Sequence, residues 1–329
     1  MYPLVFKKKG TSEAPKVLIA GHADEVGFIT KGSEKGYLSF IQLGGWWDQS
    51  LLTQRVLVRT RKGDLIPGVI VGKSSHLLSA EERSKVVTKE QMFLDVGCAS
   101  NEEVKELGIR MGDPIIPDSK FKILKRKRIK KKDNGEIETQ DVTLALGKDF
   151  DDRIGAYIAI EVLKRIGSDH PNTFFGAATT QEEIGLRRAH TTAYLVKPEV
   201  AIAMETDISG DVPGISEVKA PAKMSEGCSI LTYNTAMIPN TNLLNFAIDN
   251  AENEGIKYQL SQITGGRCDA AEFHKFEKGC PSLVIGIPTR HIHSHNSILD
   301  LDDVEQTSKL CTTMVKKLDE ETVASFTRI

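Results

Sequence analysis

The sequence is poor in cysteine, and its few cysteines are not arranged for cross-linking. There are five among 329 residues; they are odd in number, lie far apart and include no CxxC pair. A disulfide framework or a zinc ribbon needs paired, closely spaced cysteines, so the sequence argues against both. We expect reduced, structural thiols. Any bound metal should therefore be held by histidine and carboxylate side chains.

Long hydrophobic runs are also missing. The opening residues, MYPLVFKKKG, lack the apolar stretch of a signal peptide, and no later segment has 18 uninterrupted apolar residues. The sequence therefore indicates neither secretion nor a membrane span, and we expect a cytoplasmic protein.

A strong charge of either sign is absent as well. Lysine and arginine number 43 and aspartate and glutamate 45, a formal net charge of −2, so bulk charge predicts no attraction to nucleic acid or to a membrane. One basic run, KILKRKRIKKKDNGEIE, occupies residues 122–138. Nucleic-acid binding is one interpretation of this run. Because lysine-rich edge strands protect sheets from unwanted pairing, we expect a solvated hairpin instead.

Apolar runs that alternate with helical patterns indicate an α/β protein. Runs of strand length occupy residues 16–20, 174–180, 200–204 and 282–287. Residues 152–167 carry isoleucine or valine at every fourth position, acids at the start and glycine at the end, which predicts a helix. Further helical stretches lie at residues 241–255 and 301–318. We expect a sheet with helices on its faces.

The middle of the sequence has a different pattern. Between about residues 31 and 140, short alternating segments such as Arg55–Arg59 are separated by glycine-containing turns, which is typical of a small β domain. The α/β pattern resumes only afterwards. We therefore expect a discontinuous domain of residues 1–32 and 140–329, with an inserted β domain of residues 33–139.

Histidines and carboxylates gather at predicted strand ends and in loops. They are His22 and Asp24, Asp151 and Asp152, Glu182 and Glu183, Glu205 and Asp207, and His293. In this class of fold, the ends of neighbouring strands form a crevice that collects such residues. Converging carboxylates would repel one another and lose hydration, and bound cations would remove that objection. The pattern therefore favours a metal site.

Two pairs suggest separate roles within such a site. A ligating imidazole needs its second nitrogen held, and Asp24 stands two residues after His22; an ordinary surface pair is the alternative. Glu182 and Glu183 would project in different directions in an extended segment. One of them can then bind metal while the other stays available as a general base.

Six motifs together, in this order, resemble the M42 metallopeptidases, the glutamyl or tetrahedral-type aminopeptidases. They are GHADEVGF, GKDFDDRIGAY, TTQEEIGLRRA, AIAMETDISGDVPG, GGRCDAAEFH and IPTRHIHSHNSILDLDD. The resemblance implies a mixed-sheet metallopeptidase domain with helices on both faces. It also implies that the insert is a small β-barrel-like dimerisation domain.

The resemblance further implies a site with two divalent metal ions. His22 and His293 would be terminal ligands, and Asp151 would bridge the two ions. Glu183 would bind one ion and Glu205 the other. Glu182 would be the catalytic base and Asp24 the partner of His22. Zinc is the default expectation, with cobalt or manganese as alternatives.

The expected activity is removal of the N-terminal residue from peptides with a free N-terminus. The resemblance also implies a homo-oligomer built from dimers, up to twelve subunits, and a longer N-terminal segment than this chain has. Two alternatives stay open. One is an endoglucanase-type glycoside hydrolase, which would use paired carboxylates without metal. The other is a non-catalytic scaffold with the same fold.

Overall fold

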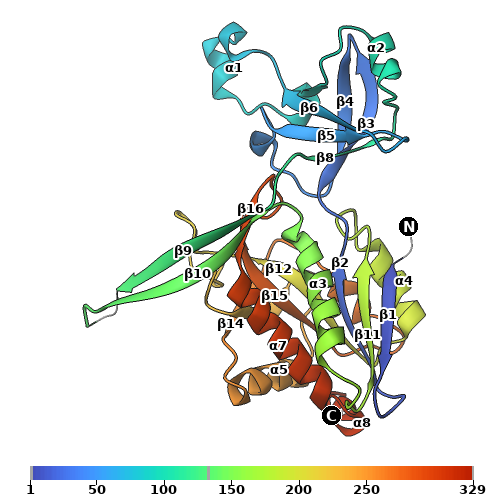
Figure 1. The fold of residues 1–329 in the computed structure, drawn as a ribbon, viewed down its shortest axis with the longest axis vertical. Helices are drawn as coiled ribbons and strands as arrows, with labels where there is room; N and C mark the ends of the chain where they lie inside the picture. The colour runs from blue at the N-terminus through green and yellow to red at the C-terminus, as the bar shows by residue number, and fades with distance from the viewer. Residues whose placement is uncertain (1–2, 132–133, 328–329) are drawn as a thin grey trace. The chain divides into compact units, whose positions relative to one another are not determined.

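The computed structural model describes residues 3–131 and 134–327. Lys132 and Asp133, within the basic run, lie outside the described residues. The chain forms two compact units (Figure 1). The first contains residues 1–24, 121–292 and 297–329, and the second contains residues 25–120 and 293–296. In the part of the chain that the structure describes, no helix is long and apolar enough to span a membrane.

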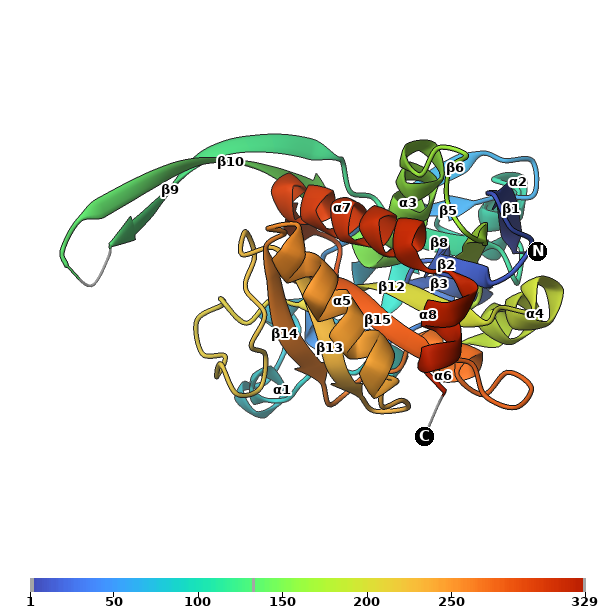
Figure 2. The same ribbon diagram turned by 90° about the horizontal axis from the view of Figure 1, so that it is seen from below.

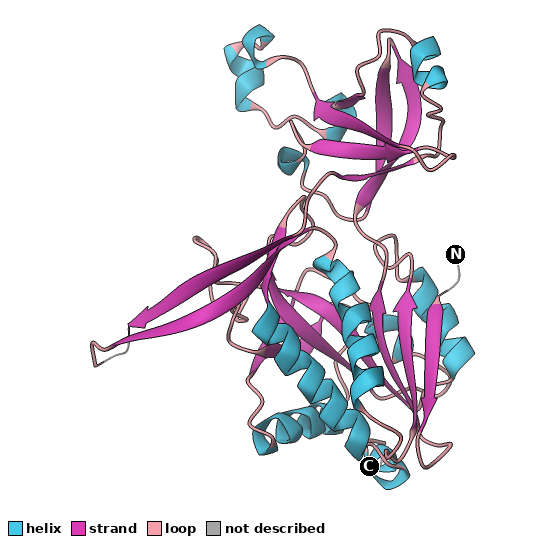
Figure 3. Cartoon of the chain, viewed as in Figure 1, coloured by secondary structure: helices cyan, strands magenta, loops and turns pink. Residues whose placement is uncertain are grey.

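A ten-stranded mixed sheet forms the centre of the first unit (Figure 3). Eight strands follow the order β1-β11-β2-β12-β15-β16-β10-β9, and β13 and β14 branch from β15. The strands are β1 (Leu4–Lys9), β2 (Lys16–His22), β9 (Lys122–Lys131), β10 (Ile137–Gly147), β11 (Thr173–Thr179), β12 (Val200–Ile208), β13 (Cys228–Asn234), β14 (Tyr258–Ile263), β15 (Ser282–Arg290) and β16 (Ser297–Asp300).

Helices cover both faces of this sheet, as the sequence predicts. They are α3 (Phe150–Arg165), α4 (Arg187–Val196), α5 (Thr241–Asn253), α6 (Ala270–Phe273), α7 (Leu301–Lys317) and α8 (Glu320–Ser325). Side chains of β2 alternate between two hydrophobic cores: Val17 and Ile19 lie in the core with α3, α5 and α7, and Leu18 and Ala20 in the core with α4 and α6. Both faces of β2 are thus buried, which is why its sequence is a continuous apolar run.

The second unit is a closed six-stranded antiparallel barrel, in agreement with the expected β-barrel-like fold. The strand order around the barrel is β3-β4-β7-β6-β5-β8. The elements are β3 (Gly27–Glu34), β4 (Tyr37–Leu43), β5 (Arg55–Arg59), β6 (Leu65–Val71), β7 (Phe93–Asp95) and β8 (Pro114–Pro117), with the short helices α1 (Ala80–Ser84) and α2 (Asn101–Glu106). Its own core contains the stacked rings of Phe28 and Trp46.

Two features of the first unit differ from the sequence analysis. Residues 122–131 and 137–139, which we expected in the insert, form β9 and the start of β10. These strands belong to the large sheet because β10 continues into pairing with β16. The first strand of the chain is β1 rather than the run at residue 16, and β1 pairs antiparallel with β11. Half-buried edge strands such as β1 carry a weaker apolar signal than central strands.

Candidate metal centre

Three neighbouring parallel strands deliver acids and a histidine to one end of the large sheet. His22 is the last residue of β2 and pairs with Thr179, the last residue of β11. On the other side of β2, Ala20 pairs with Ala203 of β12, which places Glu205 at the level of His22. Glu182 is the third residue after the end of β11. The crevice at the carboxyl ends of these strands is where such a fold collects its ligands.

The structure brings together four of the expected ligands. Potential ligand atoms of His22, Asp151 and Glu205 lie within 4.8 Å of one another, and so do ligand oxygens of Asp151 and Glu183. His22 and Glu205 are buried, with exposed fractions of 1% and 7%. Asp151 therefore stands between two sets of possible ligands, which is the position of a shared carboxylate.

The hydrogen bonds of His22 define which ring nitrogen faces the acids. Its Nδ1 lies 3.0 Å from the backbone oxygen of Asp24, and a carbonyl oxygen can only accept, so Nδ1 is the donor. In a neutral ring, Nε2 then carries a lone pair, and it faces Asp151 Oδ1 at 3.3 Å. Two acceptors at this distance need a proton or a cation between them. The nitrogen and oxygen donors fit a divalent metal ion.

Asp152 holds the main chain around this site. It is completely buried; its Oδ2 accepts the backbone N–H of His22 at 3.2 Å, and its Oδ1 accepts that of Gly155 at 3.1 Å. Asp151 and Asp152 have non-helical backbone angles at the start of α3, so Asp151 is not fixed in a regular helical turn. Arg153 Nε donates to the backbone oxygen of Ala23 at 3.1 Å, which ties α3 to the end of β2.

Asp24 acts at a different place from the one that the sequence suggested. The backbone oxygen of Asp24, rather than its carboxylate, is the nearer partner of His22 Nδ1, since Asp24 Oδ1 is 3.7 Å away. The carboxylate instead accepts the backbone N–H groups of Glu182 at 3.2 Å and of Glu183 at 3.3 Å. One aspartate thus orients the histidine through its main chain and the glutamate pair through its side chain.

Burial and crowding change the acidity of these carboxyl groups. Burial raises the pKa of Glu182 to about 8, with further raising contributions from the charges of Asp269 and Glu183. Burial and neighbouring acids also raise the pKa of Glu205 well above its ordinary value. Burial lowers the pKa of His22, but the hydrogen bond to Asp151 and the charges of Asp151, Asp152 and Glu182 together raise it well above its ordinary value. Without a cation, this group of side chains therefore retains protons at neutral pH.

Asp269 is a buried acid near the site that the sequence analysis did not single out. Its exposed fraction is 2%, and the hydroxyl of Thr179 donates to its Oδ2. Burial raises the pKa of Asp269 to about 6. Among the neighbouring acids, the charge of Asp269 makes the largest contribution to the raised pKa of Glu182. The only signal for it in the sequence was its place in the motif GGRCDAAEFH.

His293 belongs to the second unit, in the short segment of residues 293–296. Its Nδ1 lies 2.7 Å from the backbone oxygen of Gly45 and must donate to it. In the neutral ring this leaves Nε2 as the nitrogen with a lone pair. His293 therefore has the same tautomer as His22, each ring being fixed by a main-chain carbonyl.

The sequence matches the family model of the M42 glutamyl aminopeptidases over residues 3–310. Among curated proteins, the putative aminopeptidase FrvX of Escherichia coli is 32% identical over 98% of this chain and 85% of its own length. The glutamyl aminopeptidase of Lactococcus lactis is 29% identical over 98% of this chain and 86% of its own length.

Solved structures show the same fold. The TET aminopeptidase of a marine-sediment Thaumarchaeota archaeon is 48% identical, with a TM-score of 0.91 over 99% of this chain and 87% of its own. The TET1 peptidase of Pyrococcus horikoshii, described as assembling into a tetrahedron or a large octahedral shell, is 26% identical, with a TM-score of 0.77 over 96% and 87% of the two chains. A Thermotoga maritima protein titled endoglucanase is 28% identical, with a TM-score of 0.72 over 98% and 86%.

The family that the six motifs suggested is thus confirmed over nearly the whole sequence. The fold is confirmed as well, including the mixed sheet and the barrel. The chain belongs to the M42 glutamyl aminopeptidase family, and it is a peptidase, that is, a hydrolase.

Proposed function

We propose that this chain is a two-metal aminopeptidase that removes the N-terminal residue from peptides with a free N-terminus. The observation that carries the proposal is the approach of His22 Nε2 to Asp151 Oδ1, 3.3 Å apart among buried acids. Desolvating several carboxylates costs several kcal/mol for each ion unless the charges are compensated. Divalent cations compensate them, and a proton-transferring carboxylate then remains available in the same crevice.

The proposed ligands divide between two ions. His22 and Glu205 hold one ion and Glu183 and His293 hold the other, with Asp151 shared by both. Support for this division comes from the ligand atoms of His22, Glu205 and Glu183 that lie close to Asp151 and from the matching tautomers of the two histidines. Zinc suits the donors best, and cobalt and manganese suit them as well.

Bound divalent ions supply two effects here: they lower the pKa of a water molecule and polarise the peptide carbonyl. Glu182 takes the proton from this water as it attacks the carbonyl carbon, and then gives the proton to the departing amine nitrogen. The main chain of Glu182 is held by the Asp24 carboxylate, which fixes the position of the base.

A chelate-and-restore assay across aminoacyl anilides tests this proposal. Activity should disappear when a chelator strips the protein and return with zinc, cobalt or manganese, and the anilides that are cleaved report the residue preference. If metal-loaded protein cleaves none of a broad panel and no unblocked peptide, the proposal is wrong. Fewer than one bound metal per chain after reconstitution would favour the non-catalytic scaffold.

A glycoside hydrolase fits the site less well, although one structural relative is titled endoglucanase. Glycoside hydrolysis needs two carboxyl groups about 5 to 9.5 Å apart. Here ligand atoms of Asp151 lie within 4.8 Å of those of Glu205 and of Glu183. Such a reaction also leaves His22 without a role. Cellulose hydrolysis that a chelator does not affect would reverse this preference.

We also propose that the chain works as a homo-oligomer built from dimers, with the barrel of the second unit as its dimerisation domain. Support comes from the P. horikoshii relative, which is described as assembling into a tetrahedron or a large octahedral shell. Light scattering after gel filtration measures the number of subunits.

A further inference from the structure

The β9–β10 hairpin extends beyond the rest of its sheet. β16 pairs with β10 only from Leu144 to Gly147. Before that point, residues 137–143 of β10 pair only with residues 125–131 of β9. Figures 1 and 2 show this two-stranded extension, here called the β arm, projecting from the first unit. A two-stranded ribbon is at best marginally stable alone in water, so the arm needs something to cover it.

One face of the arm is apolar as well as basic. Ile129 pairs with Thr139, and Ile137 is the next residue on the same face of β10, so the two isoleucines are diagonal neighbours. They are 68% and 71% exposed. Lys125 and Lys127 share this face, with Asp141 directly opposite Lys127, since side chains alternate along a strand. Two neighbouring exposed isoleucines between lysines form a surface suited to a protein partner.

The charge of β9 decides what kind of partner fits. Seven of its ten residues, KILKRKRIKK, are lysine or arginine. Pairing of two β9 edges would bring like charges opposite one another, which destabilises a sheet. The partner surface should therefore be acidic. Single-stranded nucleic acid is the less suitable acid, because its sites typically add aromatic side chains that stack on bases, and the exposed apolar residues on this face are isoleucines.

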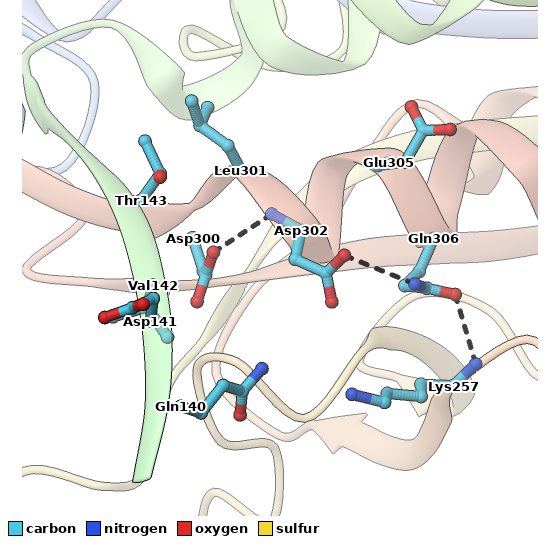
Figure 4. A pocket seen from close by; sticks show the side chains of 10 residues that line it. All are labelled: Gln140, Asp141, Val142, Thr143, Lys257, Asp300, Leu301, Asp302, Glu305 and Gln306. Carbon is cyan, nitrogen blue, oxygen red and sulfur yellow. Dashed lines mark hydrogen bonds between the residues drawn. The ribbon is translucent and has the colours of Figure 1, made fainter. Parts of the chain in front are cut away.

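The same unit carries an acidic groove beside the base of the arm (Figure 4). It has a volume of about 540 Å³ and is lined by β10, by Lys257 and by the first turns of α7. Its exposed acids are Asp141 and Asp302, beside Lys257; Asp300 is buried, and the Glu305 carboxylate accepts two hydrogen bonds from Arg165. Asp302 is exposed on the first turn of α7, with its side chain at the groove.

We propose that the β arm of one copy of this chain docks in the acidic groove of a second copy. Arm and groove lie on the same unit, so a two-fold axis lets each copy supply its arm to the other, as in other closed dimers. The contact covers both isoleucines and pairs the lysines with Asp302. This inference rests on the proposed homo-oligomer and names one of its interfaces.

Reciprocal charge reversal tests this contact in the full chain. Sedimentation velocity of the wild type, of Lys125→Glu with Lys127→Glu, of Asp302→Lys, and of all three changes together gives the mass of each. Each reversal alone should raise the dissociation constant of the arm contact at least tenfold, and the combination should restore assembly at least in part. Lys219→Glu with Lys278→Glu, two exposed lysines outside the arm, is the matched control.

The outcomes distinguish a failure of the arm contact from a failure of the proposed homo-oligomer. A wild type that stays monomeric at every concentration overturns both. A wild type that assembles with an arm variant of unchanged mass overturns only the arm contact. The arm contact is also wrong if the arm variant keeps its mass but loses binding to a single-stranded DNA or RNA probe. That result would assign the arm to nucleic acid. Should the charge variant fail to fold, Ile129→Ser with Ile137→Ser tests the same face.

Discussion

The carboxylate of Asp24 accepts the backbone N–H of Glu182 at 3.2 Å, although the two residues are 158 positions apart. Its other oxygen accepts the N–H of Glu183 at 3.3 Å. This one side chain thus fixes the segment that carries both the proposed base and a proposed ligand.

The variant Asp24→Asn should lower kcat/KM by about 10- to 100-fold, the usual cost of losing a group that orients a metal ligand. An asparagine amide would turn an NH₂ group toward one of the two backbone N–H groups, so only one hydrogen bond could remain. Steady-state kinetics with saturating metal on an aminoacyl anilide measures the loss. Asp249→Asn, exposed on α5, is the control. An Asp24→Asn enzyme with wild-type kinetics would remove Asp24 from the site.

The neighbouring glutamates should respond differently to the same change. Glu182→Gln should retain both metal ions and lose about 100- to 10,000-fold in kcat, the usual range for general acid–base catalysis. Glu183→Gln should instead lose metal affinity, because it replaces a charged ligand. Metal analysis by mass spectrometry together with kcat for both variants distinguishes base from ligand. The reverse pattern would exchange their roles.

Removing the metal should make stability depend on pH. The pKa of Glu182 is raised from 4.5 to about 8 in the folded protein without metal. A raised folded-state pKa gives stability that is complete below pH 4.5 and is lost as the pH rises through about 8. Thermal unfolding of chelated protein should therefore show a melting temperature that falls over this window.

Metal should counteract this fall. At one hundred times its dissociation constant, one bound ion adds about 2.7 kcal/mol of stability. The metal-loaded protein should thus melt at a higher temperature, by an amount that grows with pH. A melting temperature that is equal with and without chelator at pH 8 would contradict a metal site among these acids.

A second pH effect should arise far from the site, at Asp303. Its Oδ2 accepts the backbone N–H of Ser225 at 2.6 Å and its Oδ1 that of Gly227 at 2.8 Å. Burial raises its pKa from 3.8 to about 7. The stability that this group contributes is complete below pH 3.8 and is lost as the pH rises through about 7. Ionisation therefore destabilises the fold between these values.

Asp303→Asn should remove this slope and cost about 1 to 3 kcal/mol at low pH, since its NH₂ group leaves one buried N–H without an acceptor. Urea unfolding at pH 5 and pH 8 measures both effects, with Asp169→Asn at an exposed position as the control. The difference in unfolding free energy between wild type and Asp303→Asn should be smaller at pH 8. An equal difference at both pH values would contradict the raised pKa.

The elements around the site could be predicted because buried strands and helices have recognisable patterns of apolar residues. The apolar run that starts at Lys16 and ends near His22 indicates a strand covered on both faces, and the acids that follow such runs are expected at the sheet edge. The spacing of Ile154, Ile158 and Val162, four residues apart, likewise indicates α3. For the same reason, the grouping of Asp151 with His22 and Glu205 could be expected from the order of the strands and the family motifs.

Other features depend on contacts that cannot be predicted from the types of residue involved. His22 is held by the backbone oxygen of Asp24, and any residue offers that oxygen, so the sequence suggested the carboxylate instead. Asp269 does not directly follow an apolar run, and only the packing of Thr179 against it places it near Glu182. The hairpin of β9 and β10 directly follows the barrel strands along the sequence, and only the pairing of its base with β16 assigns it to the large sheet.

The position of β2 in the sheet also sets the order in which the enzyme can be made. This strand is buried on both sides by β11 and β12, whose sequences follow only after the whole barrel. At about 5 to 20 residues per second, a ribosome leaves β2 without neighbours for roughly ten to thirty seconds. During that time the barrel, with a core of its own, can already fold. Full-length synthesis is therefore a precondition for the crevice, and a nascent chain stopped before β12 carries His22 on an unprotected, aggregation-prone strand.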